Sequence, residues 1–303
     1  MSLVVVNHSK KMRRQDFIFW IIGFAILFFS LVTLLALIID LFTTGWPRIN
    51  PEFFTSFASR FPEKAGILAA WVGSLLIIIV TASMAIPLGV ATAIYLEEYS
   101  TKSKLSRLIE LNILNLAGVP SIIYGIMSLG IFVYYFHWGQ SIITASLTLA
   151  LLILPIIIVA TRESIRTIPQ FIREASYSVG ATKWQTIRHH ILPYSSGGIM
   201  TGVVIALSRA IGETAPLITV GALSFIAFLP TAPLTAEPPY FSTQWLFDPY
   251  TVLPIQMFNW VSRPQEEFHV NAAAAGAVLL TLTLALNGLA IFIRYRFRKR
   301  YKW

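Results

Sequence analysis

Residues 141–160 read SIITASLTLALLILPIIIVA and contain no charged side chain. An α-helix needs about 20 consecutive apolar residues to cross the hydrocarbon core of a bilayer, and this run has that length. A membrane β-strand would be about half as long and would alternate apolar with polar side chains, which this run does not do. The run therefore predicts a transmembrane helix.

Charged residues are scarce along the whole chain. They make up 12% of the 303 residues, while apolar side chains make up 56%. A soluble domain would carry about twice that share of charge. Five further long apolar segments lie at about residues 17–42, 66–96, 109–136, from 195 onward, and 271–293. We therefore expect an all-α integral membrane protein with six transmembrane helices.

Lys and Arg residues are distributed unevenly among the predicted loops. Eighteen of the 23 lie in the N-terminal segment, the second-to-third loop, the fourth-to-fifth loop and the C-terminal tail, whereas four lie in the alternate loops. Basic residues collect in the cytoplasmic loops of membrane proteins. This bias predicts that both termini are cytoplasmic.

The chain also lacks two kinds of residue pattern. It contains no cysteine, which excludes disulfide bonds and thiolate metal sites. It contains no Walker-type glycine loop, so ATP has to be hydrolysed on another chain. We expect no metal site and no cofactor in this chain. A membrane enzyme is disfavoured because no nucleophile–base set is present.

The fifth apolar segment, 195–229, is too long for one straight span. Pro216 lies inside it, and proline kinks or ends a helix. We expect one helix to about Pro216 and a less regular continuation toward the outer face. The following loop, 230–269, is rich in proline and aromatic residues, and an interfacial position is favoured over contact with an external partner.

Arg209 and Glu213 are charged residues inside this fifth segment. Arg209 lies about fourteen residues into the predicted helix, near the middle of the membrane, and Glu213 lies four residues later on the same face. An isolated charge at this depth costs several kcal/mol, so the two side chains should face the bundle interior. They could form an internal salt bridge that fixes helix packing. Alternatively, the planar fork of Arg209 could bind a phosphate or carboxylate group.

The loop at 162–193 is far longer than a connection between two spans requires. Its apolar residues recur at helical spacing, Pro169 can open a helix, Gly180 can make a left-handed turn, and Pro193 can start the next helix. The loop is predicted to form two short helices that meet at Gly180. Such an element either lies on the membrane surface or docks into another protein.

The motif Glu174-Ala175-Ser176, followed by Gly180 and by Leu192-Pro193, resembles the EAA loop of bacterial ABC importer permeases. Ser176 replaces the second alanine of that motif, and His190 stands where isoleucine is usual. The resemblance implies the type I ABC importer permease architecture, with 66–303 as its transmembrane domain. It assigns 1–65 to an N-terminal cytoplasmic segment, the first helix and an external loop. It further implies that Glu174, Ala175, Gly180, Leu192 and Pro193 couple the chain to an ATPase.

Three further segments narrow the resemblance. They are RAIGETAPL at 209–217, GVPSIIYG at 118–125 and TVLPIQ at 251–256. Together they resemble the PstA-type permeases of bacterial phosphate importers. The resemblance implies a pathway or gating role for Arg209, Glu213, Ser121 and Tyr124.

The same resemblance implies where the chain acts and with what. It implies import of inorganic phosphate across the bacterial cytoplasmic (inner) membrane. The implied partners are a PstC-like second permease, a PstB-like ATPase dimer that binds ATP and magnesium, and a PstS-like external phosphate-binding protein. The alternative, an ion-coupled secondary anion transporter, would explain the Arg209–Glu213 pair but not the loop with its corner at Gly180.

Overall fold

Every regular element of the computed structural model is helical within the residues it describes, 2–100, 103–233, 240 and 242–300. The side chains of 2–14, 105 and 297–300 are not among those described. In chain order the helices are α1 (Ser2–Gly45), η1 (Trp46–Arg48), α2 (Pro51–Thr55), η2 (Pro62–Lys64), α3 (Leu68–Ile94), η3 (Tyr95–Tyr99), α4 (Lys104–Ala117), α5 (Ser121–Ser128), η4 (Leu129–Tyr135), α6 (Ile142–Arg166), α7 (Gln170–Ser178), α8 (Lys183–Thr186), η5 (Ile187–Ile191), α9 (Leu192–Gly212), α10 (Ala215–Val220), η6 (Gln244–Phe247), α11 (Leu253–Val261) and α12 (Glu266–Arg300). The elements η3, η4 and η5 are π-helical turns.

Five of the described helical stretches are long and apolar enough to cross a membrane, and counting one bent helix pair as a single span gives six. The bent pair corrects one expectation, because segment 109–136 is not a single helix. It breaks between α4 and α5, whose axes differ by 106°. The break lies at Gly118, Val119 and Pro120, and the ring of Pro120 disfavours helical backbone at the residue before it.

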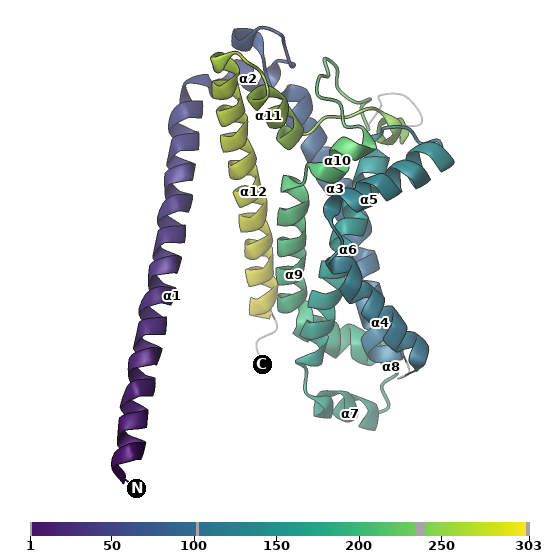
Figure 1. Ribbon diagram of the computed structural model, residues 1–303. Helices are drawn as coiled ribbons and strands as arrows, with labels where there is room; N and C mark the ends of the chain where they lie inside the picture. The colour runs from purple at the N-terminus through teal and green to yellow at the C-terminus, as the bar shows by residue number, and fades with distance from the viewer. Residues whose placement is uncertain (1, 101–102, 234–239, 241, 301–303) are drawn as a thin grey trace.

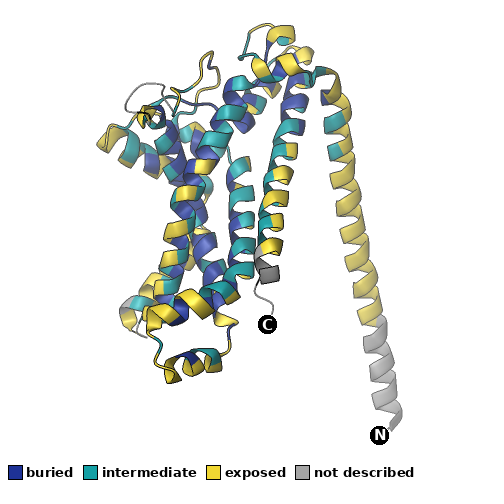
Figure 2. Ribbon diagram, turned by 180° about the vertical axis from the view of Figure 1, so that it is seen from behind, coloured by how far each residue is buried: buried dark blue, intermediate teal, exposed yellow. Residues whose placement is uncertain are grey.

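The helices α3, α6 and α9 form the packed centre of the bundle, where α6 contacts both of the others. Glycines allow the close approach. A side chain at Gly202 would overlap Ala160 of α6, and one at Gly89 would overlap Ile157. A hydroxyl of α3 also bonds across the contact, since Thr81 Oγ1 donates to the carbonyl of Ser146 over 3.2 Å. Figure 2 shows this centre as the most deeply buried part of the ribbon.

Helix α1 stands apart from the bundle along most of its length (Figures 1 and 2). None of its most apolar window is buried. It meets α12 only near its C-terminal end, where Gly45 lies against the backbone of Ala273 and Ala274. Arg48 fixes this corner by donating to Asn271 Oδ1 over 3.0 Å and to carbonyls of the 62–65 loop. The apolar surface of α1 is therefore available to lipid or to another protein.

Helix α9 ends at Gly212, four residues before the predicted end at Pro216. A helix continued through Pro216 would bring its ring against the carbonyl of residue 212. The chain instead runs extended at Glu213, and Pro216 lies in the first turn of α10. Gly221, with φ +98°, ends that short helix.

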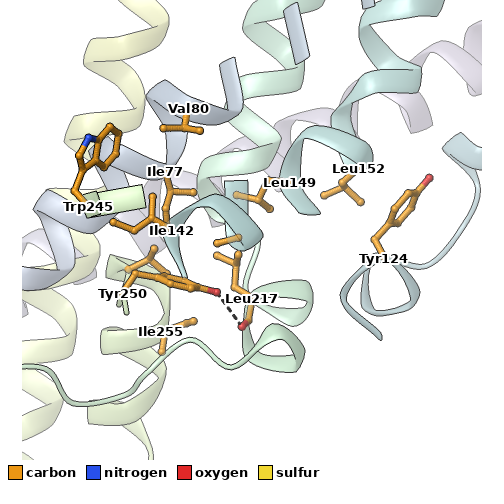
Figure 3. Packing of buried hydrophobic residues seen from close by; sticks show 12 residues of the cluster. Ile77, Val80, Tyr124, Ile142, Leu149, Leu152, Leu217, Trp245, Tyr250 and Ile255 are labelled. Carbon is orange, nitrogen blue, oxygen red and sulfur yellow. Dashed lines mark hydrogen bonds between the residues drawn. The ribbon is translucent and has the colours of Figure 1, made fainter. Parts of the chain in front are cut away.

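Residues 250–260, within the loop predicted to lie at the membrane interface, are mostly buried against other helices of the chain, and the interfacial position stays a prediction. Tyr250, Leu253 and Trp260 are almost fully inaccessible, and α11 packs against α12. Burial raises the pKa of the Tyr250 hydroxyl, which stays protonated and donates to the Leu217 carbonyl over 3.5 Å. Figure 3 shows this ring beside Leu217 and Ile255.

The start of α1, the end of α12 and the α7–α8 segment lie at the same end of the molecule (Figure 1). This arrangement agrees with termini that share one side of the membrane. Of the basic residues that predict the orientation, Lys102 and Lys302 lie outside the described residues. The loop prolines Pro238 and Pro239 also lie outside them.

Candidate functional site

The corner between α7 and α8 has the predicted form of two short helices that meet at Gly180. Gly180 has φ +85°, a left-handed conformation that glycine adopts at little cost. Thr182 begins α8 with a capping box, in which Gln185 N donates to the Thr182 hydroxyl and Thr182 N donates to the Gln185 side chain. Caps of this kind fix where a helix starts.

One part of the loop prediction is wrong. Helix α8 does not stop before Pro193 but continues through η5 into α9, so that one helical stretch runs from Lys183 to Gly212. Leu192 and Pro193 therefore lie inside a continuous helix. Proline has no N–H to donate and clashes with the carbonyl four residues earlier. The wide π-helical turn η5 ends at Ile191, two residues before Pro193.

The outer surface of the α7–α8 corner is exposed and apolar. Val179 is 83% exposed, and Phe171 and Trp184 are more than half exposed. Glu174 and Ala175 lie on the same exposed side, where Glu174 accepts a hydrogen bond from Gln170 over 3.0 Å. Large apolar side chains gathered on a protruding polar element are typical of a protein-binding surface.

A groove of about 520 Å³ lies between α7 and the start of α9. Its lining includes Ala175, Val179, His190, Pro193 and Tyr194. Several residues of the EAA-like motif therefore border one hollow surface. Gly180 makes the corner beside it.

Ser176, which departs from the EAA pattern, is buried against α8. Its hydroxyl lies 2.8 Å from the Thr186 hydroxyl, and both residues are almost inaccessible. A buried hydroxyl needs a hydrogen-bond partner, and each of these supplies one for the other. The serine thus joins α7 to α8 by a hydrogen bond that the alanine usual at this position of the EAA motif could not make.

Sequence reasoning missed a group of ion pairs beneath this corner. Glu97 and Glu98, in η3, receive hydrogen bonds from arginines of α6 and α7. The sequence feature that points to these ion pairs is the two adjacent carboxylates of Glu97 and Glu98, directly after an apolar helix. The arginines of the loop indicate membrane orientation, but nothing in the local sequence pairs them with carboxylates 69 and 75 positions earlier.

The predicted Arg209–Glu213 pair is formed. Arg209 Nε donates to Glu213 Oε1 over 3.2 Å, with Arg209 in the last turn of α9 and Glu213 directly after it. The Arg209 side chain is 44% exposed and the Glu213 side chain 17%. The guanidinium group is therefore accessible in the isolated chain, at the point where α9 breaks.

Ser121 and Tyr124 lie at the start of α5, close to the same break. Gly125 packs against Pro216 and Thr219 of α10, so the segments 118–125 and 209–217 meet in space. The Tyr124 hydroxyl donates to the Leu116 carbonyl over 2.8 Å and so spans the α4–α5 bend. Figure 3 shows Tyr124 at the edge of the buried cluster. A pathway role for Ser121 and Tyr124 stays a prediction.

Helix α12 contacts α9 beside Arg209. The Ser208 hydroxyl donates to Asn287 Oδ1 over 2.6 Å. Six residues before the end of α12, Arg294 donates to the Thr201 hydroxyl over 2.7 Å. These two bonds hold α9 against α12.

Residues 85–303 match the model of the family described as binding-protein-dependent transport system inner membrane component. The chain is similar to the phosphate transport system permease protein PstA of Haemophilus influenzae, with 31% identity over 299 residues covering 97% of this chain and 95% of the relative. It is also similar to the PstA protein of Mycobacterium leprae, with 32% identity covering 81% of this chain and 76% of the relative.

Solved structures share the fold at low sequence identity. A chain of a bacterial ABC transporter involved in the import of the acidic polysaccharide alginate superposes with a TM-score of 0.65 at 15% identity, covering 93% of this chain and 96% of that one. A chain of the inward-facing MetNI methionine ABC transporter gives a TM-score of 0.54 at 17% identity, covering 76% and 94%. At these identities the likeness concerns the fold alone.

Proposed function

Because the chain belongs to the family of binding-protein-dependent transport system inner membrane components, we propose that it is the permease subunit of an ATP-driven importer of inorganic phosphate. It is a multi-pass protein of the inner membrane, with helices long and apolar enough to cross the bilayer. The relatives named as phosphate transport permeases cover most of its length. They support phosphate as the cargo.

The observation that carries the proposal is the accessible Arg209 guanidinium at the break of α9. Its bond to Glu213 occupies one edge of the guanidinium, and the side chain is 44% exposed. A guanidinium presents a fork of donors that matches the oxygens of phosphate. In this proposal Glu213 holds the arginine until phosphate arrives and then releases it to the substrate.

The same reasoning places Ser121 and Tyr124 in the pathway or its gate. They lie on α5, which packs on α10 directly after the Arg209–Glu213 break. The pathway is completed by a second, PstC-like permease. The exposed apolar length of α1 offers that subunit a contact surface in addition to lipid.

In this proposal the α7–α8 corner is the surface that docks onto an ATPase dimer of the PstB type, and that dimer binds ATP and magnesium. Glu174, Ala175 and Gly180 form the exposed corner, while Leu192 and Pro193 are the first residues of α9, which continues from α8 through η5. The exposed Val179 and Trp184 would be covered on docking. An external PstS-like protein would deliver phosphate at the opposite end of the bundle.

A reconstitution experiment tests the cargo. The chain is purified with its second permease and ATPase, placed in proteoliposomes, and supplied with loaded binding protein. We expect ATP-dependent uptake of radiolabelled phosphate that excess sulfate does not suppress. Uptake of sulfate in preference to phosphate, with the complex intact, would contradict the assignment of phosphate.

A further inference from the structure

The turn η3 (Tyr95–Tyr99), at the end of α3, contacts four other helical elements, α4, α6, α7 and α8, through successive side chains. Leu96 is buried in a cluster with Ile113 of α4 and Ile158 of α6. Glu97 and Glu98 form ion pairs, and the ring of Tyr99 lies 4.9 Å from Lys183 Nζ of α8. Single π-helical turns of this kind occur frequently at functional sites.

Arg173 joins α7 to this turn. Its guanidinium donates to Glu98 Oε1 from Nε over 3.1 Å and from Nη2 over 2.8 Å. It also donates to the carbonyls of Ile165 and Ile168 at the end of α6. The Glu98 side chain is 5% exposed and that of Arg173 18%. A charge pair enclosed in this way, with several fixed hydrogen bonds, holds one geometry, unlike a solvent-exposed pair.

Glu97 extends the connection into the membrane helices. It accepts bonds from Arg162 over 3.3 Å and from Arg166 over 3.0 Å, both on α6. Arg162, buried itself, also donates to Glu110 of α4 over 2.7 Å. Helix α4 leads through the 106° bend to α5, which packs on α10 beside the Arg209–Glu213 break.

The two faces of α7 have different partners. Ile172, Arg173 and Ser176 face inward: Ile172 packs on a buried isoleucine cluster, and Ser176 bonds to α8. The opposite face, with Phe171 and Glu174, is exposed. Arg173 is thus the residue of α7 that joins the exposed corner to the end of α3 by an ion pair.

We propose that the η3 turn transmits motion of the α7–α8 corner to α3, α4 and α6, with the Arg173–Glu98 pair as the first joint. This inference rests on the proposed function, because it assigns a mechanical role to the contact between the corner and an ATPase. Arg173 and Glu98 are positioning residues. They touch neither phosphate nor ATP.

The test compares ATP hydrolysed per phosphate transported in the reconstituted complex. Glu98→Gln keeps the size of the side chain but removes the charge that holds Arg173. We expect the ratio of ATP to phosphate to rise at least about fivefold, the scale of a typical coupling between two sites, while the ATPase still copurifies. A ratio equal to that of the unaltered complex, with assembly intact, would overturn the proposal.

Glu163→Gln is the matched control. The Glu163 side chain is 63% exposed, and its one ion pair with the side chains that the structure describes is with Arg166, one turn away on the same helix. Removing its charge breaks no contact between helices, so the ratio should not change. If Glu163→Gln raised the ratio of ATP to phosphate as much as Glu98→Gln, any loss of negative charge near the α7–α8 corner would have the same effect. That result would contradict a specific role for the Arg173–Glu98 pair.

A second variant keeps the test decisive if Glu98→Gln assembles poorly. The chain has no cysteine, so Glu98→Cys with Arg173→Cys can be bridged selectively by a short bifunctional thiol reagent and released by a reductant. Bridging should restore the low ratio, and release should raise it again. If the ratio of ATP hydrolysed to phosphate transported is the same with and without the bridge, the proposed role of the Arg173–Glu98 pair is overturned. Failure of the unaltered complex to import phosphate would instead contradict the proposed function.

Discussion

Replacing Arg209 by glutamine separates a transport role from a packing role. The arginine bonds to Glu213 over 3.2 Å and is 44% exposed. An exposed ion pair contributes about 0–1 kcal/mol to stability, so the folded complex should form in nearly normal amount. A fork that donates two hydrogen bonds to a charged ligand contributes about 1.5–3 kcal/mol for each bond. Losing both should lower transport by roughly two to four orders of magnitude.

The assay is phosphate uptake per assembled complex in proteoliposomes, with the amount of complex measured by copurification of the ATPase. Arg209→Lys keeps the positive charge but lacks the planar fork of donors. Its phosphate uptake should therefore fall between that of the unaltered complex and that of Arg209→Gln. Arg294→Gln is a matched control, because Arg294 also lies on a span but bonds to a neutral hydroxyl, that of Thr201. Wild-type uptake by Arg209→Gln, or equal losses in Arg209→Gln and Arg294→Gln, would refute the reasoning.

Three further predictions concern the corner and the helix core. Gly180→Val places a branched residue at φ +85° and should release the ATPase in a copurification assay, at a cost of about 1–2 kcal/mol of local strain; retained ATPase with normal coupling would count against the docking role. Gly202→Ala forces a methyl against α6 and should lower the thermal stability of the purified complex by about 1–3 kcal/mol. Gly197→Ala on the same helix meets nothing and should not, so equal losses would contradict the packing account. Ser176→Ala removes the bond to Thr186 and should cost only about 0.5–1.5 kcal/mol, with transport retained; loss of transport would show a role beyond holding α7 to α8.

Much of the fold follows from local sequence rules. Apolar runs of about 20 residues have few alternatives to transmembrane helices. Apart from the fifth span, which begins at Lys183 and not near residue 195, the spans agree with the prediction to within about six residues. Gly180 was identifiable because a glycine between two amphipathic segments commonly adopts a left-handed conformation. The Arg209–Glu213 pair followed from i, i+4 geometry alone.

What failed depends on contacts between distant segments. Gly118 and Pro120 signalled an irregular helix, but the size of the bend is determined by packing of α5 on α10. Residues 250–260 have the aromatic and proline content of an interfacial loop, and their local sequence does not indicate that α11 packs against α3 and α12. Glu98 and Arg173 are 75 positions apart in the sequence. At that separation the pattern of charges does not indicate which acidic residue pairs with which basic one.

The central claim is that this chain imports phosphate by using ATP. Its most direct test is phosphate uptake by vesicles containing the complete complex, measured with ATP removed while proton and sodium gradients are maintained. The account predicts that uptake stops and returns when ATP is supplied inside the ATPase-facing compartment. Uptake that persists on ion gradients alone would contradict it and would identify the chain as part of an ion-coupled anion transporter.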